Sequence, residues 1–229
     1  MTSSRRAALG TAAALVGLVI VGAGARFLCL PGHRPELRSG ERYGIDVSHH
    51  QGSISWHRVA ADGISFAYLK ASEGSSFVDP RFDANWRRAG EAGIDRGAYH
   101  YFSLCSAGAN QARNFLDVVP NRLELPPAVD LELAANCSER PTESTVRREL
   151  MRFLGAIETD VGRQAILYVG DDFDELYPFV NELDRPRWQL GFVLRPNDPW
   201  LVWQVGSYAR VDGIDGPVGL DVLRTADGG

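Results

Sequence analysis

The chain has 229 residues, of which 45% are hydrophobic, with 24 glycines and 12 prolines. This length suits one globular domain of about 200 residues with a sizeable core, on the scale of a single barrel or sandwich. The formal net charge is −5, and such an acidic surface argues against nucleic acid as the partner.

The first 25 residues predict export. Arg5 and Arg6 precede an uncharged run of nineteen residues, 7–25, which ends in small residues. A basic start followed by an apolar run is typical of a signal peptide, and ~20 apolar residues also suffice to span a bilayer. We expect a periplasmic or extracellular protein, and we favour a retained membrane anchor over a cleaved signal peptide. Residues 26–42, rich in Pro and Gly, predict a linker.

From residue 43 to 224 the pattern predicts one barrel domain. The expected strands cover residues 43–47, 66–71, 97–102, 128–132, 165–169, 188–193, 201–205 and 219–223. Helices are expected near Trp56, after Asp79 as N-cap, and over residues 107–118, 142–161 and 172–177. Repeated βα units followed by extra strands predict an α/β fold, a parallel TIM-like (β/α) barrel that is irregular in its last third, with fewer than eight helices.

Two of the three cysteines are placed to form a disulfide. Cys105 and Cys137 each follow an expected strand, so their loops should emerge at the same end of a parallel sheet. In an exported protein these two are the natural pair, and two free buried thiols are the alternative. Their spacing resembles no zinc site.

The segment PPAVDLEL, residues 126–133, brings two carboxyl groups together. Residues two apart on a strand point the same way, so Asp130 and Glu132 share one face while Val129 and Leu131 take the apolar face. Two enclosed carboxyl groups repel when both are ionised, which raises the pKa of at least one and leaves a proton donor beside an anion. Glycosidases use this pair. The competing interpretation is that the acids cap a loop or pair with arginines.

Two further acids, Asp46 and Asp221, lie near the ends of the first and last expected strands. Barrel closure makes these strands neighbours, and barrel active sites gather at the C-terminal ends of the strands. We therefore expect Asp46 and Asp221 to lie close together, across the mouth from Asp130 and Glu132, so that four acids share one rim. For each acid alone, a solvated loop position or a cap is the competing interpretation.

Aromatic side chains on or near the strands are candidate platforms for sugars, with core packing as the alternative for each. The candidates are Tyr68, Tyr99, Tyr101, Tyr168, Trp188 and Trp203. Lys70, the only lysine, either pairs with a site acid or is solvated, and Glu73 in the following loop is interpreted as structural.

The histidines raise the alternative of a metal hydrolase. His49 and His50 lie close to Asp46 in the sequence, and His100 could supply a third ligand. However, adjacent residues on a strand face opposite ways, and the chain has no HExxH or similar ligand spacing. We expect no metal and no other cofactor.

Six motifs occur in consistent order over nearly all of residues 43–223. They are YGIDVSHHQGSISW (43–56), FAYLKASEGSSFVDPRF (66–82), RGAYHYF (96–102), PPAVDLEL, ILYVG (166–170) and WLVWQVGSYARVDGIDGPVGLDV (200–222). Together they closely resemble family 25 glycoside hydrolases, the lysozymes that act as N-acetylmuramidases.

The resemblance implies a flattened barrel of eight strands that hydrolyses the β-1,4 bond between N-acetylmuramic acid and N-acetylglucosamine in peptidoglycan. It implies that Glu132 is the proton donor and Asp130 its partner, with Asp46 and Asp221 as the other two acids. The partners are then peptidoglycan glycan strands, and we expect a monomer.

The chain departs from the family pattern in places. Where the family usually reads DLN, this chain has Asp221, Val222 and Leu223, so an amide near that acid is missing. The family's WQY is WQV here, which removes a possible sugar-contacting hydroxyl.

Two alternatives remain. One is a membrane-tethered wall-binding barrel without activity. The other is a chitinase-like glycosidase, although that signature requires more acids before Asp130 than residues 126–129 offer.

Overall fold

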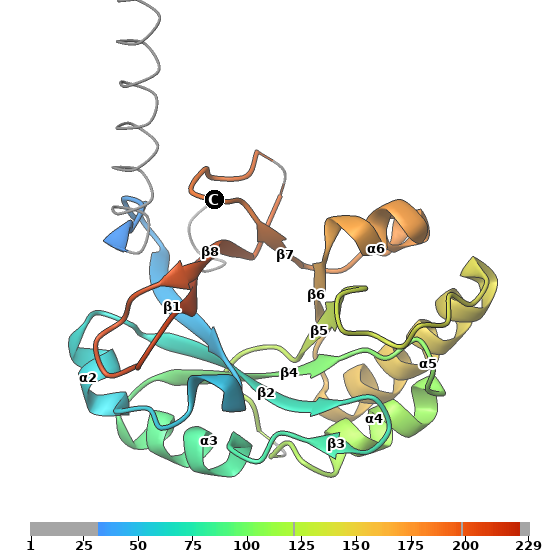
Figure 1. Ribbon diagram of the computed structural model, residues 1–229, viewed down its shortest axis with the longest axis horizontal. Helices are drawn as coiled ribbons and strands as arrows, with labels where there is room; N and C mark the ends of the chain where they lie inside the picture. Colours follow the sequence, from blue (N-terminus) through green and yellow to red (C-terminus); the bar gives the residue numbers. More distant parts are fainter. Residues whose placement is uncertain (1–31, 121, 198, 225–229) are drawn as a thin grey trace, which may run out of the picture.

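The computed structural model describes residues 32–120, 122–197 and 199–224, and these form a closed barrel of eight strands (Figure 1). A short ninth strand, β3 (Phe77–Val78), pairs with the C-terminal end of β2. The barrel strands are β1 (Glu41–Val47), β2 (Phe66–Glu73), β4 (Asp95–Tyr101), β5 (Ala128–Leu131), β6 (Ile166–Val169), β7 (Arg187–Leu190), β8 (Val202–Ala209) and β9 (Val218–Arg224). The expected barrel is confirmed.

The direction of the last strand differs from expectation. Seven of the eight barrel strands, all except β9, are parallel to one another, but β9 runs antiparallel to both β8 and β1. The expected adjacency of the first and last strands is confirmed, whereas the expectation of a wholly parallel barrel is wrong. Because β9 is reversed, Asp221 pairs with Gly44, and Asp46 pairs with Gly219.

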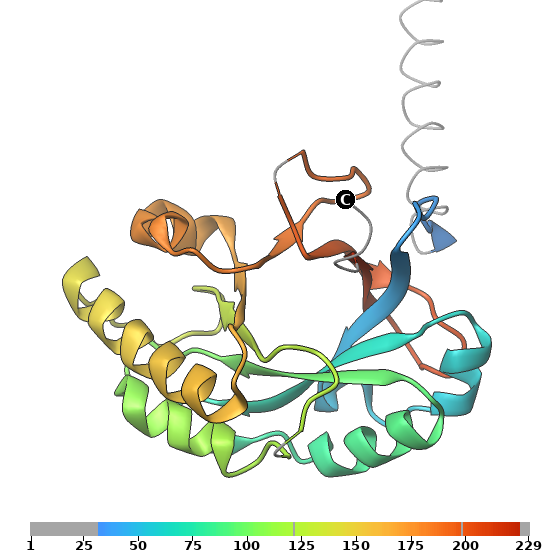
Figure 2. The ribbon, with the colours of Figure 1, turned by 180° about the vertical axis from the view of Figure 1, so that it is seen from behind.

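Helices cover only part of the barrel (Figure 2). α3, α4 and α5 lie on the outer side of the strands from β2 to β5, while no described helix follows β7 or β8. The helices are η2 (His49–Gln51), α2 (Trp56–Ala61), α3 (Phe82–Glu91), α4 (Gly108–Leu116), α5 (Glu143–Val161), α6 (Asp171–Leu176) and η3 (Pro178–Glu182). The last third of the barrel is therefore irregular, as expected.

Helix boundaries follow local capping chemistry. α5 begins after Thr142 and ends at Gly162, whose φ of 73° is a left-handed conformation that glycine adopts without strain. Helix α3 begins at Phe82, so Asp79 is not its N-cap. The Asp79 carboxylate instead accepts hydrogen bonds from the backbone N–H groups of Arg81 and His49, both at 2.8 Å. Asp79 thus ties the start of α3 to the loop after β1.

The barrel has two apolar cores. The outer core lies between the strands and the helices and includes Val129, Leu131 and Phe153. The inner core fills the barrel with Tyr68, Trp188 and their neighbours, and these two rings lie 4.7 Å apart between centroids. This packing fills the lower part of the barrel lumen and leaves the lumen open at the end near the C-termini of the parallel strands.

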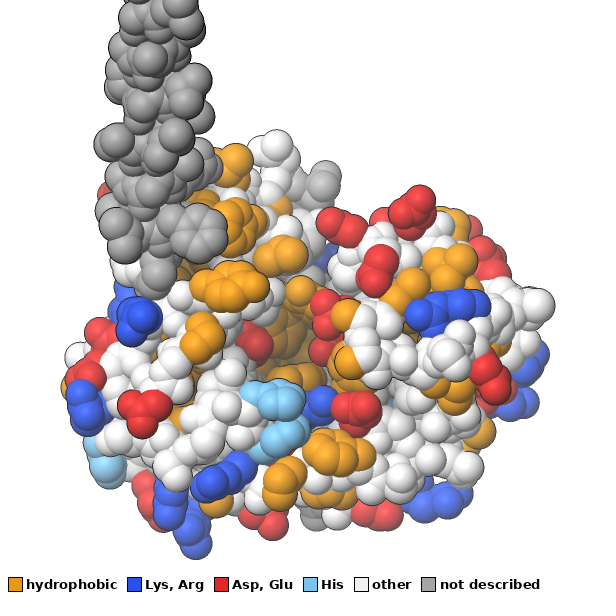
Figure 3. All heavy atoms as spheres, viewed as in Figure 1, with side chains coloured by type: hydrophobic (Ala, Val, Ile, Leu, Met, Phe, Trp, Pro, Cys, Tyr) orange, Lys and Arg blue, Asp and Glu red, His pale blue; other side chains and the backbone are white. Residues whose placement is uncertain are grey.

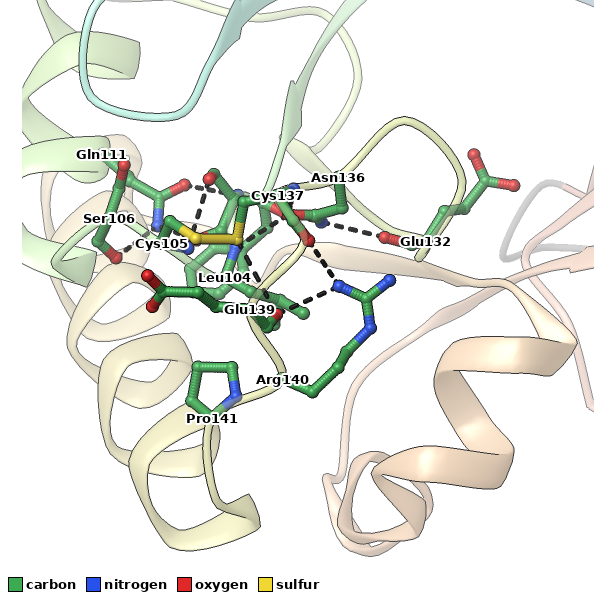
Figure 4. The surroundings of a disulfide bond; sticks show 12 residues. Leu104, Cys105, Ser106, Gln111, Glu132, Asn136, Cys137, Glu139, Arg140 and Pro141 are labelled. Carbon is green, nitrogen blue, oxygen red and sulfur yellow. Dashed lines mark hydrogen bonds between the residues drawn. A yellow bond between two sulfur atoms is a disulfide. The ribbon is translucent and has the colours of Figure 1, made fainter.

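The expected disulfide between Cys105 and Cys137 is confirmed, and it joins the loops after β4 and β5 (Figure 4). Asn136 reinforces this link, because its side-chain amide donates to the carbonyls of Phe102 and Glu132, each at 2.9 Å. Its Oδ1 accepts from the N–H of Leu104 at 3.0 Å. The backbone after β5 is therefore fixed to the neighbouring loop.

The segment before β1 packs against the barrel from residue 33 onward. Arg34 forms an ion pair with Asp62, and the Tyr43 hydroxyl donates to the carbonyl of Pro35. The predicted signal peptide or anchor lies outside the described residues. Within the described ranges no helix is long and apolar enough to cross a membrane.

Candidate active site

A pocket of about 220 Å³ opens at the mouth of the barrel. Figure 3 shows a hollow in this face with acidic side chains at its edge. The pocket is lined by Asp46, Tyr99, Ala128, Val129, Asp130, Glu132, Tyr168, Trp188, Gln204 and Ser207. Three of the four predicted acids therefore line one cavity.

Asp130 and Glu132 come from β5 and the residue that follows its end. Val129 and Leu131 belong to the outer core, so the predicted alternation of faces is confirmed. Burial raises the pKa of Asp130 well above its ordinary value, and the nearby charge of Glu132 raises it further. Burial also raises the pKa of Glu132, and the charges of Asp172 and Asp46 add to this effect. The pair can therefore hold a proton at pH values where an exposed carboxyl group loses it.

The absence of a side chain at Gly170, directly after β6, leaves space for the Glu132 side chain. A Cβ atom added at Gly170, directly after β6, would lie 3.2 Å from Cγ of Glu132 and 3.0 Å from Oδ1 of Asp172. Both contacts are tighter than ordinary van der Waals separations. A larger residue at position 170 would thus press on the Glu132 side chain.

Asp46 is held by a chain of side chains across the barrel. The Gln204 amide donates to Oδ2 of Asp46 at 2.8 Å, and the Tyr168 hydroxyl donates to Oε1 of Gln204 at 3.2 Å. Gly219 makes this arrangement possible, since an added Cβ there would lie 1.7 Å from Oδ2 of Asp46. Burial raises the pKa of Asp46, while the hydrogen bonds from Gln204 and Asp221 oppose that rise.

Asp221 lies beneath Asp46 and not on the rim. It has no exposed surface, does not line the pocket, and accepts a hydrogen bond from Nε1 of Trp188 at 3.0 Å. Burial, followed by the charge of Asp46, raises the pKa of Asp221 well above its ordinary value. The expectation of four acids on one rim is therefore wrong for Asp221, because the antiparallel β9 sets it opposite Gly44, deeper than Asp46.

The aromatic candidates differ in whether they reach the pocket. Tyr99, Tyr168 and Trp188 line the pocket. Tyr68 is fully buried in the inner core, where its hydroxyl donates to the carbonyl of Pro126 at 3.1 Å. Tyr101 is 7% exposed, and its hydroxyl donates to the carbonyls of Glu132 and Ala134.

Trp203 does not face the pocket. Gln204 lines the pocket, and alternation along β8 sends the Trp203 ring to the outer core, where it is 1% exposed. Its Nε1 donates to the carbonyl of Gly191 at 2.8 Å. Trp203 therefore has a packing position in this structure.

The histidines do not converge on one point. His49 and His50 lie in the short helix η2, not on a strand, and their ring centroids are 4.1 Å apart, so the expectation that they face opposite ways is wrong. His100 faces outward from β4, where it contacts Ser72 and Gln111. Burial lowers the pKa of His100 to about 3, which keeps this side chain neutral. Among the described residues no group of three or more His, Cys, Asp or Glu side chains is arranged to hold a metal ion.

Sequence reasoning missed Gln204, which joins Tyr168 to Asp46. The signal lay in alternation along β8, because a residue next to an outward-facing Trp203 faces the lumen. Which of the two faces inward depends on the closure of the barrel, and the local pattern does not encode it.

Comparison with known proteins agrees with this geometry. The sequence model of Glycosyl hydrolases family 25 matches residues 45–214. The chain is 37% identical to Uncharacterized protein YegX of Escherichia coli K12, over 80% of this chain and 69% of that protein. It is 35% identical to Lysozyme M1 of Streptomyces globisporus, over 76% of this chain and 65% of that protein.

The fold also matches solved structures. A family 25 glycosyl hydrolase from Bacillus anthracis superposes with a TM-score of 0.76 at 30% identity, covering 85% of this chain and 94% of that one. The match of sequence, fold and acidic pocket assigns this chain to glycosyl hydrolase family 25, as a glycosidase of the lysozyme type.

Proposed function

We propose that the protein cleaves the β-1,4 bond between N-acetylmuramic acid and N-acetylglucosamine in peptidoglycan, with net retention of configuration. The observation that carries the proposal is the pair of carboxyl groups, Asp130 and Glu132, in the pocket at the barrel mouth. Burial raises the pKa of both, and the charge of Glu132 raises the pKa of Asp130 further, so the pair disfavours double ionisation and can hold one proton beside one anion.

Glycosidic cleavage passes through an oxocarbenium-like state, which needs a protonated acid at the leaving oxygen and negative charge near the anomeric carbon. We assign Glu132 as the acid, and then as the base that activates water. Asp130 either attacks the anomeric carbon or orients the 2-acetamido group of the substrate for attack. We favour the acetamido route, because the substrate class carries that group.

Asp46 and Asp221 complete the electrostatics of the site. Asp46 lines the pocket opposite Glu132, and Asp221 acts through Asp46 from below. Tyr99, Tyr168 and Trp188 offer ring faces to the sugar within the same pocket. Export of the protein to the cell wall, with residues 7–25 as signal or anchor, is part of the proposal.

The decisive experiment is mass spectrometry of fragments released from purified peptidoglycan by the wild-type protein and by Glu132→Gln. We expect fragments ending in reducing N-acetylmuramic acid, and a loss of at least about 10³-fold in rate for Glu132→Gln because no other group replaces the proton donor. Glu139→Gln is the matched control, since Glu139 is exposed and lies on the same loop. Near-normal turnover by Glu132→Gln would refute the assignment, and binding without turnover by the wild type would favour an inactive wall-binding barrel.

The stereochemical part has its own measurements. Retention predicts that proton NMR detects the β anomer of the product first. The acetamido route predicts that glycan with de-N-acetylated muramic acid is not cleaved, whereas direct attack by Asp130 leaves that glycan cleavable. A first-formed α anomer contradicts retention.

A further inference from the structure

Lys70 is the only lysine of the chain, and no step of the proposed reaction uses it. It lies on β2, its side chain is 11% exposed, and its Nζ lies 2.7 Å from Oε2 of Glu73. The ammonium group also lies 5.1 Å from the ring centroid of Tyr101 and 5.6 Å from that of Phe77. A cation held by a carboxylate and two ring faces has a fixed position.

This position is next to the catalytic pair. Strands β2, β4 and β5 are consecutive in the barrel. Lys70 on β2 pairs with Tyr99 on β4, and Tyr101 on β4 pairs with Asp130 on β5. The Tyr101 hydroxyl donates to the carbonyl of Glu132 at 3.2 Å. The ring beneath the ammonium group therefore also touches the backbone that carries Glu132.

We propose that Lys70 is a positioning residue, whose ammonium group keeps one carboxylate of the Asp130–Glu132 pair ionised while the other holds the proton. The inference rests on the proposed function, because it explains how that pair keeps two different protonation states. In a buried site without a cation, both carboxyl groups would favour the neutral form.

Electrostatics supports this geometry. Burial raises the pKa of both Asp130 and Glu132, and the Lys70 charge acts in the opposite direction on each. The other charged or titratable groups around the pair are Asp46 from β1, Glu73 from β2, Tyr99 and Tyr101 from β4, Tyr168 from β6 and Asp172 from α6. Lys70 is thus a cation that acts on both members of the pair.

A hydrogen-bonded histidine and carboxylate lie beside this arrangement. The His49 ring lies 5.7 Å from the Phe77 ring, and its Nδ1 contacts Oδ2 of Asp79 at 2.9 Å. His49 is thus already held by an acid of its own, and the Phe77 ring lies near both His49 and Lys70. Glu73 is the acid that directly holds Lys70.

The test compares the pH dependence of kcat/KM in wild type, Lys70→Met, Lys70→Arg and Glu73→Gln. Removal of the positive charge in Lys70→Met should shift both limbs of the profile to higher pH, by about 0.5 to 1 pH unit. The reason is that the ionised forms of both carboxyl groups lose a stabilising cation, which raises their pKa values. Lys70→Arg keeps the charge and should leave the limbs in place. Glu73→Gln breaks the same ion pair but removes a negative charge, so the limbs of its profile should stay in place or shift to lower pH.

These directions separate an electrostatic role from a structural one. If only the ion pair mattered, Lys70→Met and Glu73→Gln would behave alike, and an equal shift in both overturns the proposal. Unmoved limbs in Lys70→Met, or the same shift in Lys70→Arg, overturn it as well. If Lys70→Met does not fold, acetylation of the folded wild-type protein removes the charge of its only lysine side chain.

A second readout is independent of turnover. The ¹³C carboxyl resonance of Glu132, assigned by its absence in Glu132→Gln, should titrate at higher pH in Lys70→Met than in wild type. A wild-type protein that does not cleave peptidoglycan contradicts the proposed function while this titration still tests the role of Lys70. An unchanged Glu132 titration in Lys70→Met contradicts the role of Lys70 and leaves the proposed function standing.

Discussion

At the scale of single residues, the site is a stack of two carboxyl layers. Asp130, Glu132 and Asp46 face the pocket, and Asp221 supports Asp46 from the layer below. Oδ2 of Asp221 is buried without a hydrogen-bond partner, and burial raises the pKa of both Asp221 and Asp46, which favours a proton in this part of the site.

The raised pKa of Asp221 has a consequence for stability that Asp221→Asn tests. The pKa of Asp221 lies well above its ordinary 3.8 in the folded protein, so above pH 3.8 the folded state holds a proton that the unfolded state has lost. Stability therefore falls as the pH rises from about 4 through the folded pKa. Asparagine still accepts from Trp188, donates to Asp46 and has no proton to lose.

We expect Asp221→Asn to flatten this fall and to unfold at a higher temperature than wild type at pH 7. Thermal unfolding measured from pH 4 to 8 checks this. Asp160→Asn, an exposed change on α5, serves as the control and should keep the wild-type slope. A slope for Asp221→Asn equal to that of wild type would show that Asp221 is ionised in the folded protein throughout this range.

At the scale of elements, the loops after β4 and β5 behave as one unit. The disulfide between Cys105 and Cys137 closes a chain segment with a sequence separation of 32, and Asn136 adds hydrogen bonds between the same loops. The Glu132 backbone belongs to this unit through its carbonyl, which accepts from Asn136. The covalent link therefore contributes to both stability and the position of Glu132.

Replacement of both cysteines by serine should lower the free energy of unfolding by about 2–4 kcal/mol, because the unfolded chain gains freedom when a loop of this length opens. Urea denaturation of the double variant checks the value. Activity should fall in addition, since the loop that carries Glu132 loses a restraint. Wild-type protein treated with a reductant should reproduce both effects, and stability unchanged by either treatment would contradict this role.

The elements also show how far local pattern reaches. The helix at 143–161 and the placement of Asp130 and Glu132 follow from periodicity that is written into adjacent residues. The direction of β9 does not. Expected strands at 201–205 and 219–223 left a gap long enough for a parallel crossover, but β8 runs to Ala209, and the remaining connection suits only a reversal.

The same limit applies to the site residues. Alternation along β8 separates Trp203 from Gln204, but only the closure of the barrel decides which one reaches the lumen. The depth of Asp221 likewise depends on its register against Gly44, which joins residues from the two ends of the chain. Contacts of this range lie outside any local pattern.

At the scale of the whole molecule, an ion pair stabilises the lower end of the barrel seam, where β1 pairs with β9. Glu41 at the start of β1 is 2% exposed at its side chain, and Arg195 from the loop after β7 pairs with it. Burial raises the pKa of Glu41, but hydrogen bonds from Arg195 and from the N–H of Arg38 lower it to below its ordinary value. The ionised Glu41 therefore joins the segment before β1, the seam and the helix-free part of the barrel.

Arg195→Met should lower the free energy of unfolding by about 2 kcal/mol, because it leaves the buried Glu41 carboxylate with a weaker partner. Arg58→Met is the matched control. Its ion pair with Asp212 is 63% and 55% exposed, so the expected change is within about 0.5 kcal/mol. Chemical denaturation at pH 7 measures both, and equal effects would show that burial of the Glu41 pair adds nothing.

The reversed direction of β9 also determines where the chain enters and leaves the barrel. Arg224, at the end of β9, pairs with Glu41, at the start of β1, so the chain enters and leaves the barrel side by side. This entrance and exit lie at the end remote from the pocket, because the pocket opens where the parallel strands finish. A tether or fused module at either end would therefore attach to the barrel at this end and leave the pocket end free.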